Sequence, residues 1–260
     1  MKYKLLALAI LVGIWVTKQL VEVNEVSTEP KVLSQTEEIL VLPDGEATKQ
    51  IEKYGYAISA DIDAKSLRLI PNYEQKLPTK EIVEANNCQL GINGGFYDTE
   101  NKPLGLLTVK GVDISRRKTS SLFNGFVNLD SENLTIDESP ASGAGFVMQS
   151  GPILVKDGQP TMLSMARDKP ARRMVLGNTK NGKVFFLSVF DNNIENLGPY
   201  LQELPPLVAQ IAQKENLELG SAINMDGGQA SAFYAAEMTI VETEPVGSFW
   251  CATGEGARKL

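Results

Sequence analysis

An asparagine and an aspartate near the C-terminal end of the chain are spaced in a way that suggests chemistry. In the stretch Ala222 to Ser231, Asn224 and Asp226 occupy alternate positions and are followed by Gly227 and Gly228. If the stretch ends a strand, an amide and a carboxylate point into the same space, and the glycine turn offers backbone N–H groups to an anion. The alternative is an ordinary Asp-Gly-Gly hairpin turn in which Asp226 caps its own loop.

A similar stretch occurs far upstream. A short apolar run ends at Asn93, the glycines Gly94 and Gly95 follow, and Asp98 lies just beyond them. Strand ends that share this polar and glycine-rich character are expected to meet in space and build one site. A functional site at the junction of these two strand ends is therefore our working hypothesis.

The composition limits the chemistry that such a site can perform. The sequence contains no histidine, which excludes Ser-His-Asp triads, Cys-His pairs and His-ligated metal sites. Acid–base work then falls to Asp, Glu, Lys or Tyr. A net charge of −7, with Arg116-Arg117-Lys118 as the one basic cluster, argues against a nucleic-acid partner.

The N-terminal segment resembles an export signal. Residues 1–20 hold Lys2 and Lys4, then an apolar run of about a dozen residues, which is shorter than the about 20 of a membrane-spanning helix. Because no clear cleavage site follows, a signal peptide and an uncleaved membrane anchor both stay open. Residues 21–50 are predicted to be a polar linker and residues 51–260 one folded domain. The body of the protein is expected in the periplasm, the cell envelope or attached to the membrane.

An exported chain favours pairing of the two cysteines. Cys88 and Cys251 are the only cysteines in the sequence, and in an oxidising compartment they are able to form a disulfide. The alternative is two buried thiols. Neither thiol is expected to be catalytic, since no histidine is present to lower its pKa.

The elements that position these residues are predicted to form an α+β fold of mixed, largely antiparallel sheets with a few helices, in a single domain. The most secure hairpin joins residues 172–177 and 183–190 through an Asn-Gly turn. Helices are expected at 78–85 and 199–215, the second divided by Pro205-Pro206. Further strands are expected at 54–63, with 66–70 as its hairpin partner, and at 89–93, 104–110, 122–129, 134–137, 145–149, 153–156, 232–234, 238–241 and 247–252.

Four more residues are candidates with a plain structural alternative. Ser150 and Gly151 lie in a kinked segment that presents either a hydroxyl and N–H groups or only a turn. Arg173, at the mouth of a buried strand, either pairs with a structural carboxylate or binds an anionic ligand. Asp191 ends a strand, as Asp98 follows one, and both are equally well explained as turn caps.

Taken together, these motifs resemble the phosphodiester glycosidase family, which has lysosomal and exported bacterial members. The resemblance runs from about residue 55 to about residue 252 with the motifs in the family's order: residues 92–97, 150–154, 173 with 177, and 224–228. One departure follows the last motif, where Gln229 and Ala230 replace family residues and only the second of two hydroxyls, Ser231, is kept.

The resemblance implies a pocket that gathers these motifs and cleaves the bond between a sugar anomeric carbon and a phosphodiester oxygen. Asp226 is the candidate carboxylate for the oxocarbenium-like state, with Asp98 or Asp191 as its acid–base partner. Arg173 and the glycine N–H groups are candidates to hold the phosphate. No cofactor is implied, and the sugar-phosphodiester substrate is contacted by Asn93, Gly94, Gly95, Ser150, Gly151, Arg173, Asn224, Gly227, Gly228 and Ser231.

Two other classes of protein stay open at this point. A metal-dependent phosphodiesterase would use Asp226, Asn224 and Asp98 as hard oxygen ligands for a divalent ion. A module of the cell envelope would bind anionic glycans in the same pocket without turnover, since a fold does not dictate activity. The sequence names neither the sugar nor the aglycone, and it gives no oligomeric state.

Overall fold

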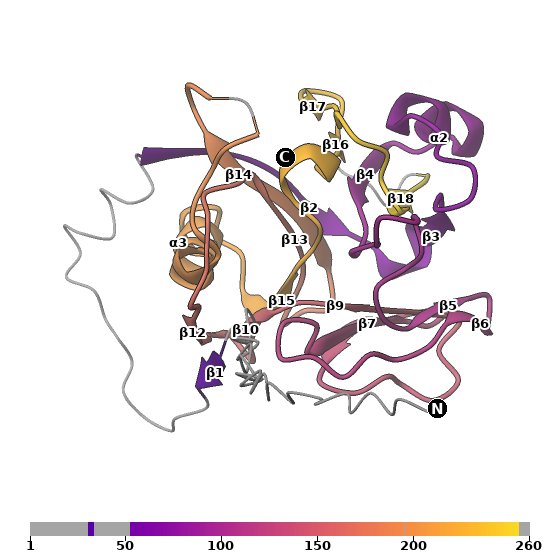
Figure 1. The fold of residues 1–260 in the computed structure, drawn as a ribbon, viewed down its shortest axis with the longest axis horizontal. Helices are drawn as coiled ribbons and strands as arrows, with labels where there is room; N and C mark the ends of the chain where they lie inside the picture. Colours follow the sequence, from indigo (N-terminus) through magenta and orange to yellow (C-terminus); the bar gives the residue numbers. More distant parts are fainter. Residues whose placement is uncertain (1–30, 34–52, 195, 255–260) are drawn as a thin grey trace, which may run out of the picture.

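The computed structural model describes residues 31–33, 53–194 and 196–254 of the chain (Figure 1). The predicted signal peptide or anchor, residues 1–20, lies outside the described residues. Within the predicted linker the described residues form one short strand, β1 (Lys31–Leu33), which pairs with β12 (Met162–Ser164). Among the helices of the described part, none combines the length and hydrophobicity that crossing a membrane requires.

The centre of the domain is a six-stranded sheet that is buried on both faces. Alternate residues of one strand enter different cores: Met174 and Leu176 face the central core, and Val175 faces the core beneath helix α3. This double burial explains why the 172–190 hairpin has almost no exposed positions. The strand order is β11–β10–β15–β13–β14–β2, with β2 (Tyr54–Ile62), β10 (Ile153–Lys156), β11 (Gln159–Pro160), β13 (Arg173–Thr179), β14 (Val184–Asp191) and β15 (Leu219–Asn224).

Helix α3 (Leu204–Lys214) covers one face of this sheet, and the second sheet lies on the other side (Figure 1). The 3₁₀-helix η2 (Leu201–Glu203) precedes α3, so Pro205 and Pro206 stand in the first turn of the α-helix. Proline is tolerated there because its missing N–H has no intrahelical acceptor. Leu207, Val208 and Ile211 are buried on the sheet, each contributing about 1.5–3 kcal/mol.

The second sheet carries the upstream motif. Its order is β17–β16–β4–β18–β3, and helix α2 (Thr79–Asn86) contacts β18. Cys88, which follows α2, forms a disulfide with Cys251 in β18, as predicted. The strands are β3 (Leu67–Pro71), β4 (Leu90–Asn93), β16 (Phe233–Tyr234), β17 (Thr239–Ile240) and β18 (Ser248–Ala252).

The third sheet is formed by the middle of the chain. Its order is β6–β5–β9–β7–β8, and the sequence analysis missed β6, whose residues are largely exposed. Val127 packs into the central core, and Phe126 and Val147 form a smaller hydrophobic cluster with Ala144. The strands are β5 (Leu107–Val109), β6 (Val112–Ser115), β7 (Gly125–Leu129), β8 (Leu134–Asp137) and β9 (Phe146–Ser150).

The predicted fold class is confirmed in its coarse form, with two corrections. The described residues form a sheet-rich single domain with two α-helices, and every strand pairing among them is antiparallel rather than mixed. The predicted hairpin of 54–63 with 66–70 is wrong, since β2 pairs with β14 and β3 pairs with β18. The 3₁₀-helix η1 (Ala64–Ser66) joins them and carries the chain into a different sheet.

Candidate active site

A cleft of about 770 Å³ opens where β15 ends, and six separate parts of the chain line it. They are the loop after β4, Leu122 just before β7, the segment between β12 and β13 with the start of β13, the approach to η2, the end of β15 with the turn that follows, and Glu244 before β18. Of the candidates from sequence, Asp98, Arg173, Asn224, Asp226, Gly227 and Gly228 line this cleft. The two motif-bearing strand ends do meet in space.

Asn224 is the last residue of β15 and is almost completely buried. Its Nδ2 donates to the Gly151 carbonyl at 3.0 Å, and its own carbonyl accepts the Ser150 hydroxyl at 2.7 Å. Among the described residues its Oδ1 has no hydrogen-bond partner. A buried acceptor without a donor is costly, and this one lies just behind the cleft wall that Asn224 helps to form.

Asp226 follows two residues later, in the tight turn that closes β15. Its Oδ1 accepts the Gly227 N–H at 2.8 Å. Burial raises the pKa of the Asp226 carboxyl to about 7; the Gly227 N–H opposes that rise, and the negative charge of Glu244 adds to it. The side chain therefore exchanges its proton near neutral pH, as a group with an acid–base task does.

Tyr97 and Glu244 also line the cleft. Burial raises the pKa of Tyr97 to about 12, and the negative charges of Asp226 and Glu244 contribute to that rise. The Tyr97 hydroxyl donates to the Pro245 carbonyl. Sequence reasoning missed both residues, although Tyr97 stands inside the upstream motif; Glu244, in a plain loop, carries no sequence signal.

Asn93 holds the turn of Asp226 in place and lies outside the cleft. Its Nδ2 donates to the Asp226 carbonyl at 2.9 Å, and its Oδ1 accepts the Ala232 N–H at 3.0 Å. The Asp226 N–H in turn donates to the Gly94 carbonyl at 3.2 Å. Asn93 is only 1% exposed, so its amide acts on the protein backbone.

The predicted anion site at the glycine N–H groups is not formed. Gly94 donates to the Ser248 carbonyl, Gly95 to Met148 Sδ, Gly227 to Asp226 Oδ1 and Gly228 to the Arg172 carbonyl. Glycine is needed here for other reasons. A Cβ on Gly227 would lie 2.5 Å from the Arg172 carbonyl oxygen, and Gly228 has a φ of +62°, a backbone conformation that favours glycine.

Ser150, Gly151 and Ser231 also lie outside the cleft lining. Ser150 and Ser231 have no exposed surface, and the Ser150 hydroxyl is committed to the Asn224 carbonyl. Gly151 accepts the Asn224 amide and has φ +150°, where a Cβ would meet the Leu122 carbonyl at 2.2 Å. Ser150 and Gly151 thus support Asn224 from behind, and the Ser231 N–H donates to the Gly228 carbonyl.

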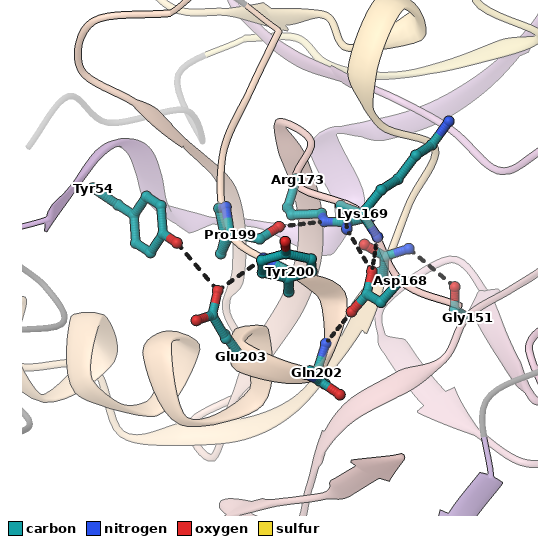
Figure 2. Close-up of polar contacts among 10 residues, drawn as sticks. Tyr54, Gly151, Asp168, Lys169, Arg173, Pro199, Tyr200, Gln202 and Glu203 are labelled. Atoms are coloured by element: carbon teal, nitrogen blue, oxygen red, sulfur yellow. Dashed lines mark hydrogen bonds and ion pairs between the residues drawn. The ribbon is translucent and has the colours of Figure 1, made fainter. Parts of the chain in front are cut away.

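Arg173 pairs with a carboxylate, which was one of the two alternatives left open by the sequence. Its Nη2 lies 3.2 Å from Asp168 Oδ1 and 2.7 Å from the Lys169 carbonyl, and its Nε donates to the Pro199 carbonyl at 3.0 Å (Figure 2). Burial lowers the pKa of the Arg173 guanidinium, and Asp168 opposes this. The fork is thus fixed in one orientation at the cleft wall, beside the exposed cations Arg167 and Lys169.

The two other candidate carboxylates are engaged as turn caps. Asp98 lines the cleft, but its Oδ1 accepts the N–H groups of Glu100 and Lys102, each at 2.9 Å. Asp191 Oδ1 accepts the Asn193 N–H at 2.8 Å, and Asp191 does not line the cleft. Among the residues that the structure describes, no three acidic or cysteine side chains converge as a metal site would require.

The fold has relatives among solved structures. The catalytic domain of zebrafish N-acetylglucosamine-1-phosphodiester alpha-N-acetylglucosaminidase, auto-inhibited by its pro-peptide, superposes with a TM-score of 0.56 at 15% identity, covering 87% of this chain and 88% of that one. A hypothetical protein from Synechocystis gives a TM-score of 0.56 at 13% identity and covers 76% of this chain; the match spans 59% of its own length. At such identities the likeness shows the fold alone.

Sequence comparison identifies the family. None of the curated proteins matches this chain. The family model described as phosphodiester glycosidase matches residues 86–254, well over half of the chain and the whole of the cleft lining. The chain therefore belongs to the phosphodiester glycosidase family.

Proposed function

We propose that the protein hydrolyses the bond between the anomeric carbon of a sugar and an oxygen of a phosphodiester. The observation that carries the proposal is a carboxyl with a pKa of about 7, Asp226, in the same cleft wall as the fixed guanidinium of Arg173. Family membership supports a glycosidase-type hydrolase. The proposed substrate is a sugar-phosphodiester of an envelope or extracellular glycan.

The reaction needs one carboxylate near the sugar and a positive wall near the phosphate. The bond from the anomeric carbon to oxygen breaks, its electron pair stays on the phosphate oxygen, and ionised Asp226 stabilises the positive charge that develops on the sugar ring. Water then adds to the anomeric carbon, and its proton passes to Asp226, whose pKa suits that task. The products are a sugar with a free anomeric hydroxyl and a phosphate monoester.

Phosphate binding is assigned to side chains, because the glycine N–H groups are already engaged. Arg167 and Lys169 present exposed positive charges to the phosphate, and Arg173, whose Nε and Nη2 are engaged within the protein, adds the charge of its fixed guanidinium at the same wall. A phosphate monoester needs little protonation on leaving, since its second pKa is about 6, so a site without histidine suffices. Asn224, which lines the cleft, is proposed to contact the sugar.

One carboxylate other than Asp98 and Asp191 acts on Asp226. Glu244 lines the cleft, and its charge contributes to the raised pKa of Asp226. We therefore assign to Glu244 an electrostatic role, in which its charge raises the Asp226 pKa and it transfers no proton itself, and keep Asp98 as a cleft residue with a capping function. Asn93, Gly94, Gly95, Ser150, Gly151 and Ser231 are proposed to act on the substrate only through the backbone positions they hold.

The proposed place of action is outside the cytoplasm. The disulfide of Cys88 with Cys251 suits an oxidising compartment, and residues 1–20 have the charge and hydrophobicity of an export signal or anchor. In this proposal residues 21–50 link that segment to the domain of residues 51–260. Fractionation of cells that produce the full chain tests it: the protein is expected in the envelope or medium, and full-length protein soluble in the cytoplasm contradicts export.

Hydrolysis in ¹⁸O-labelled water tests the reaction. Label in the sugar product supports cleavage between carbon and oxygen, as proposed. Label in the phosphate instead indicates cleavage between phosphorus and oxygen, the reaction of a metal-dependent phosphodiesterase. Absence of turnover across a panel of sugar-phosphodiesters, together with tight binding of one of them, contradicts hydrolysis and favours a glycan-binding module.

A further inference from the structure

Arg173 lies between the turn that carries Asp226 and the start of η2. On one side, the Gly228 N–H donates to the Arg172 carbonyl at 2.9 Å and the Met225 N–H to the Met174 carbonyl at 2.8 Å. On the other side, Arg173 Nε donates to the Pro199 carbonyl at 3.0 Å (Figure 2). The cleft wall therefore runs from a carboxylate, through a guanidinium, to the segment around η2.

Three apolar side chains lie in the cleft wall near Arg173, alongside the charged side chains already described. Asp168, the partner of Arg173, accepts the Gln202 N–H at 3.0 Å, which places Leu201 next to the ion pair. Leu122 and Met165 also line the cleft there and pack on the same hydrophobic core as Leu201. Tyr200, which precedes Leu201 in sequence, is 39% exposed.

A phosphodiester substrate has two ester arms, one on each side of the phosphate. The order of carboxylate, guanidinium and apolar side chains along the cleft wall assigns a different part of the wall to each arm. With the sugar at Asp226 and the phosphate at Arg173, the second arm, the aglycone, extends over Leu122, Met165 and Leu201. These side chains offer no hydrogen bonds, so a carbohydrate aglycone would lose the hydrogen bonds that its hydroxyls make with water. An apolar chain would instead gain from burial.

We infer that the aglycone is an apolar alcohol, so that the preferred substrate is a sugar joined through one phosphate to a lipid-like chain. This inference rests on the proposed function for the direction of the substrate in the cleft. The chemistry that recognises the aglycone is shared by a straight alkyl chain and a branched isoprenyl chain. The test therefore contains both.

Binding of alkyl phosphates, which are the leaving products of the proposed reaction, tests the apolar wall without any turnover. Calorimetry on the full chain uses methyl, butyl, hexyl, octyl and citronellyl phosphate below their micelle concentrations, with glucose 6-phosphate as the carbohydrate competitor. Each buried methylene is expected to lower Kd about threefold to fourfold until the wall is covered. A Kd that is independent of chain length, or glucose 6-phosphate binding more tightly than hexyl phosphate, overturns the inference.

A matched pair of methionine variants locates the effect. Met165→Gln is expected to flatten the dependence of Kd on chain length, whereas Met162→Gln, on the same segment but outside the cleft lining, is expected to keep it. If both variants leave the dependence unchanged, the chain binds elsewhere and the inference is wrong. Should Met165→Gln fail to fold, the series on the unmodified protein decides.

The outcomes separate this inference from the proposed reaction. Binding that strengthens with chain length, in a protein that cleaves no sugar-phosphodiester, supports the apolar subsite and contradicts hydrolysis. Turnover of sugar-phosphodiesters with no preference for longer chains supports hydrolysis and contradicts the subsite. Tighter binding of citronellyl or of octyl phosphate tells whether the chain is isoprenoid or straight.

Discussion

The ends of β4 and β15 look alike in sequence, since each has an asparagine followed closely by two glycines, but they have different environments in the fold. The end of β4 is buried: Asn93 binds backbone groups on both sides of the turn after β15, and the Gly94 and Gly95 N–H groups are donated within the protein. The end of β15 is open to the cleft and carries Asp226. One strand end acts as scaffold for the other, so a repeated motif does not imply a repeated role.

The strongest test of this division is Asp226→Asn. The variant keeps the size of the side chain and the Gly227 hydrogen bond but removes the carboxylate, so kcat is expected to fall by about 10³-fold or more with little change in KM. Steady-state kinetics measures both. Asp98→Asn, at the same cleft, is the control and is expected to stay within about threefold of the unmodified protein. Near-normal turnover by a folded Asp226→Asn protein would make Asp226 a turn cap.

The same variant is expected to gain stability at alkaline pH. Because the folded-state pKa of Asp226 is raised from 3.8 to about 7, the folded protein keeps a proton that the unfolded chain loses, and the free energy of unfolding falls as pH rises through that window. Ionisation of Asp226 lowers the free energy of unfolding by up to about 4 kcal/mol above pH 7 and has no such effect below pH 4. The Asp226→Asn variant has no carboxyl to ionise and therefore avoids this loss. Denaturation of the variant and of the unmodified protein at pH 4 and pH 9 measures this loss. If their unfolding free energies differ by the same amount at both pH values, the raised pKa of Asp226 is contradicted.

Asn93→Ala tests the scaffold end. It leaves the Ala232 N–H and the Asp226 carbonyl without their partner, so unfolding free energy is expected to drop by about 3 kcal/mol and kcat by about tenfold to a hundredfold. Urea denaturation and kinetics report the two effects. Asn86→Ala removes a comparable amide-to-carbonyl bond in α2, far from the motif, and is expected to leave kcat unchanged. A loss of kcat in both variants would mean general destabilisation.

The smallest effect is expected at Glu244. If ionised Asp226 is the active form, kcat/KM of the unmodified protein rises with pH about tenfold per unit up to about 7 and then levels. Glu244→Gln removes a negative charge that raises the Asp226 pKa, so the midpoint moves to lower pH, by about one unit or less. Glu138→Gln, an exposed carboxylate outside the cleft, is the control. A midpoint that moves upward contradicts this assignment.

Local patterns predicted those elements whose pairing is local. The Asn181-Gly182 turn fixed the β13–β14 hairpin, and the motif after β15 led to Asp226. The partner of β3 was missed because β18 lies at the other end of the chain, and no local signal specifies so distant a pairing. The glycine N–H groups were misread for the same reason, since their acceptors, such as the Ser248 and Arg172 carbonyls, come from other segments.

The cleft lining was predicted in part because only some of its residues stand in motifs. Asp226 and Arg173 are recognisable from the strand ends that carry them. Glu244 and Asp168 lie in loops without a regular pattern, and only the folded chain brings them to the cleft. Asp191 was a reasonable candidate from its place at the end of β14, but its turn directs the carboxylate to the N–H of Asn193.

The disulfide has a further consequence for a protein that meets proteases. Cys88 and Cys251 are 163 residues apart in sequence, and every residue that lines the cleft, from Phe96 to Glu244, lies between them. The chain between these cysteines is thus a covalently closed ring that contains the whole cleft lining. A single cut in any exposed loop of that ring opens it without releasing a fragment, so both parts of a nicked molecule stay covalently joined.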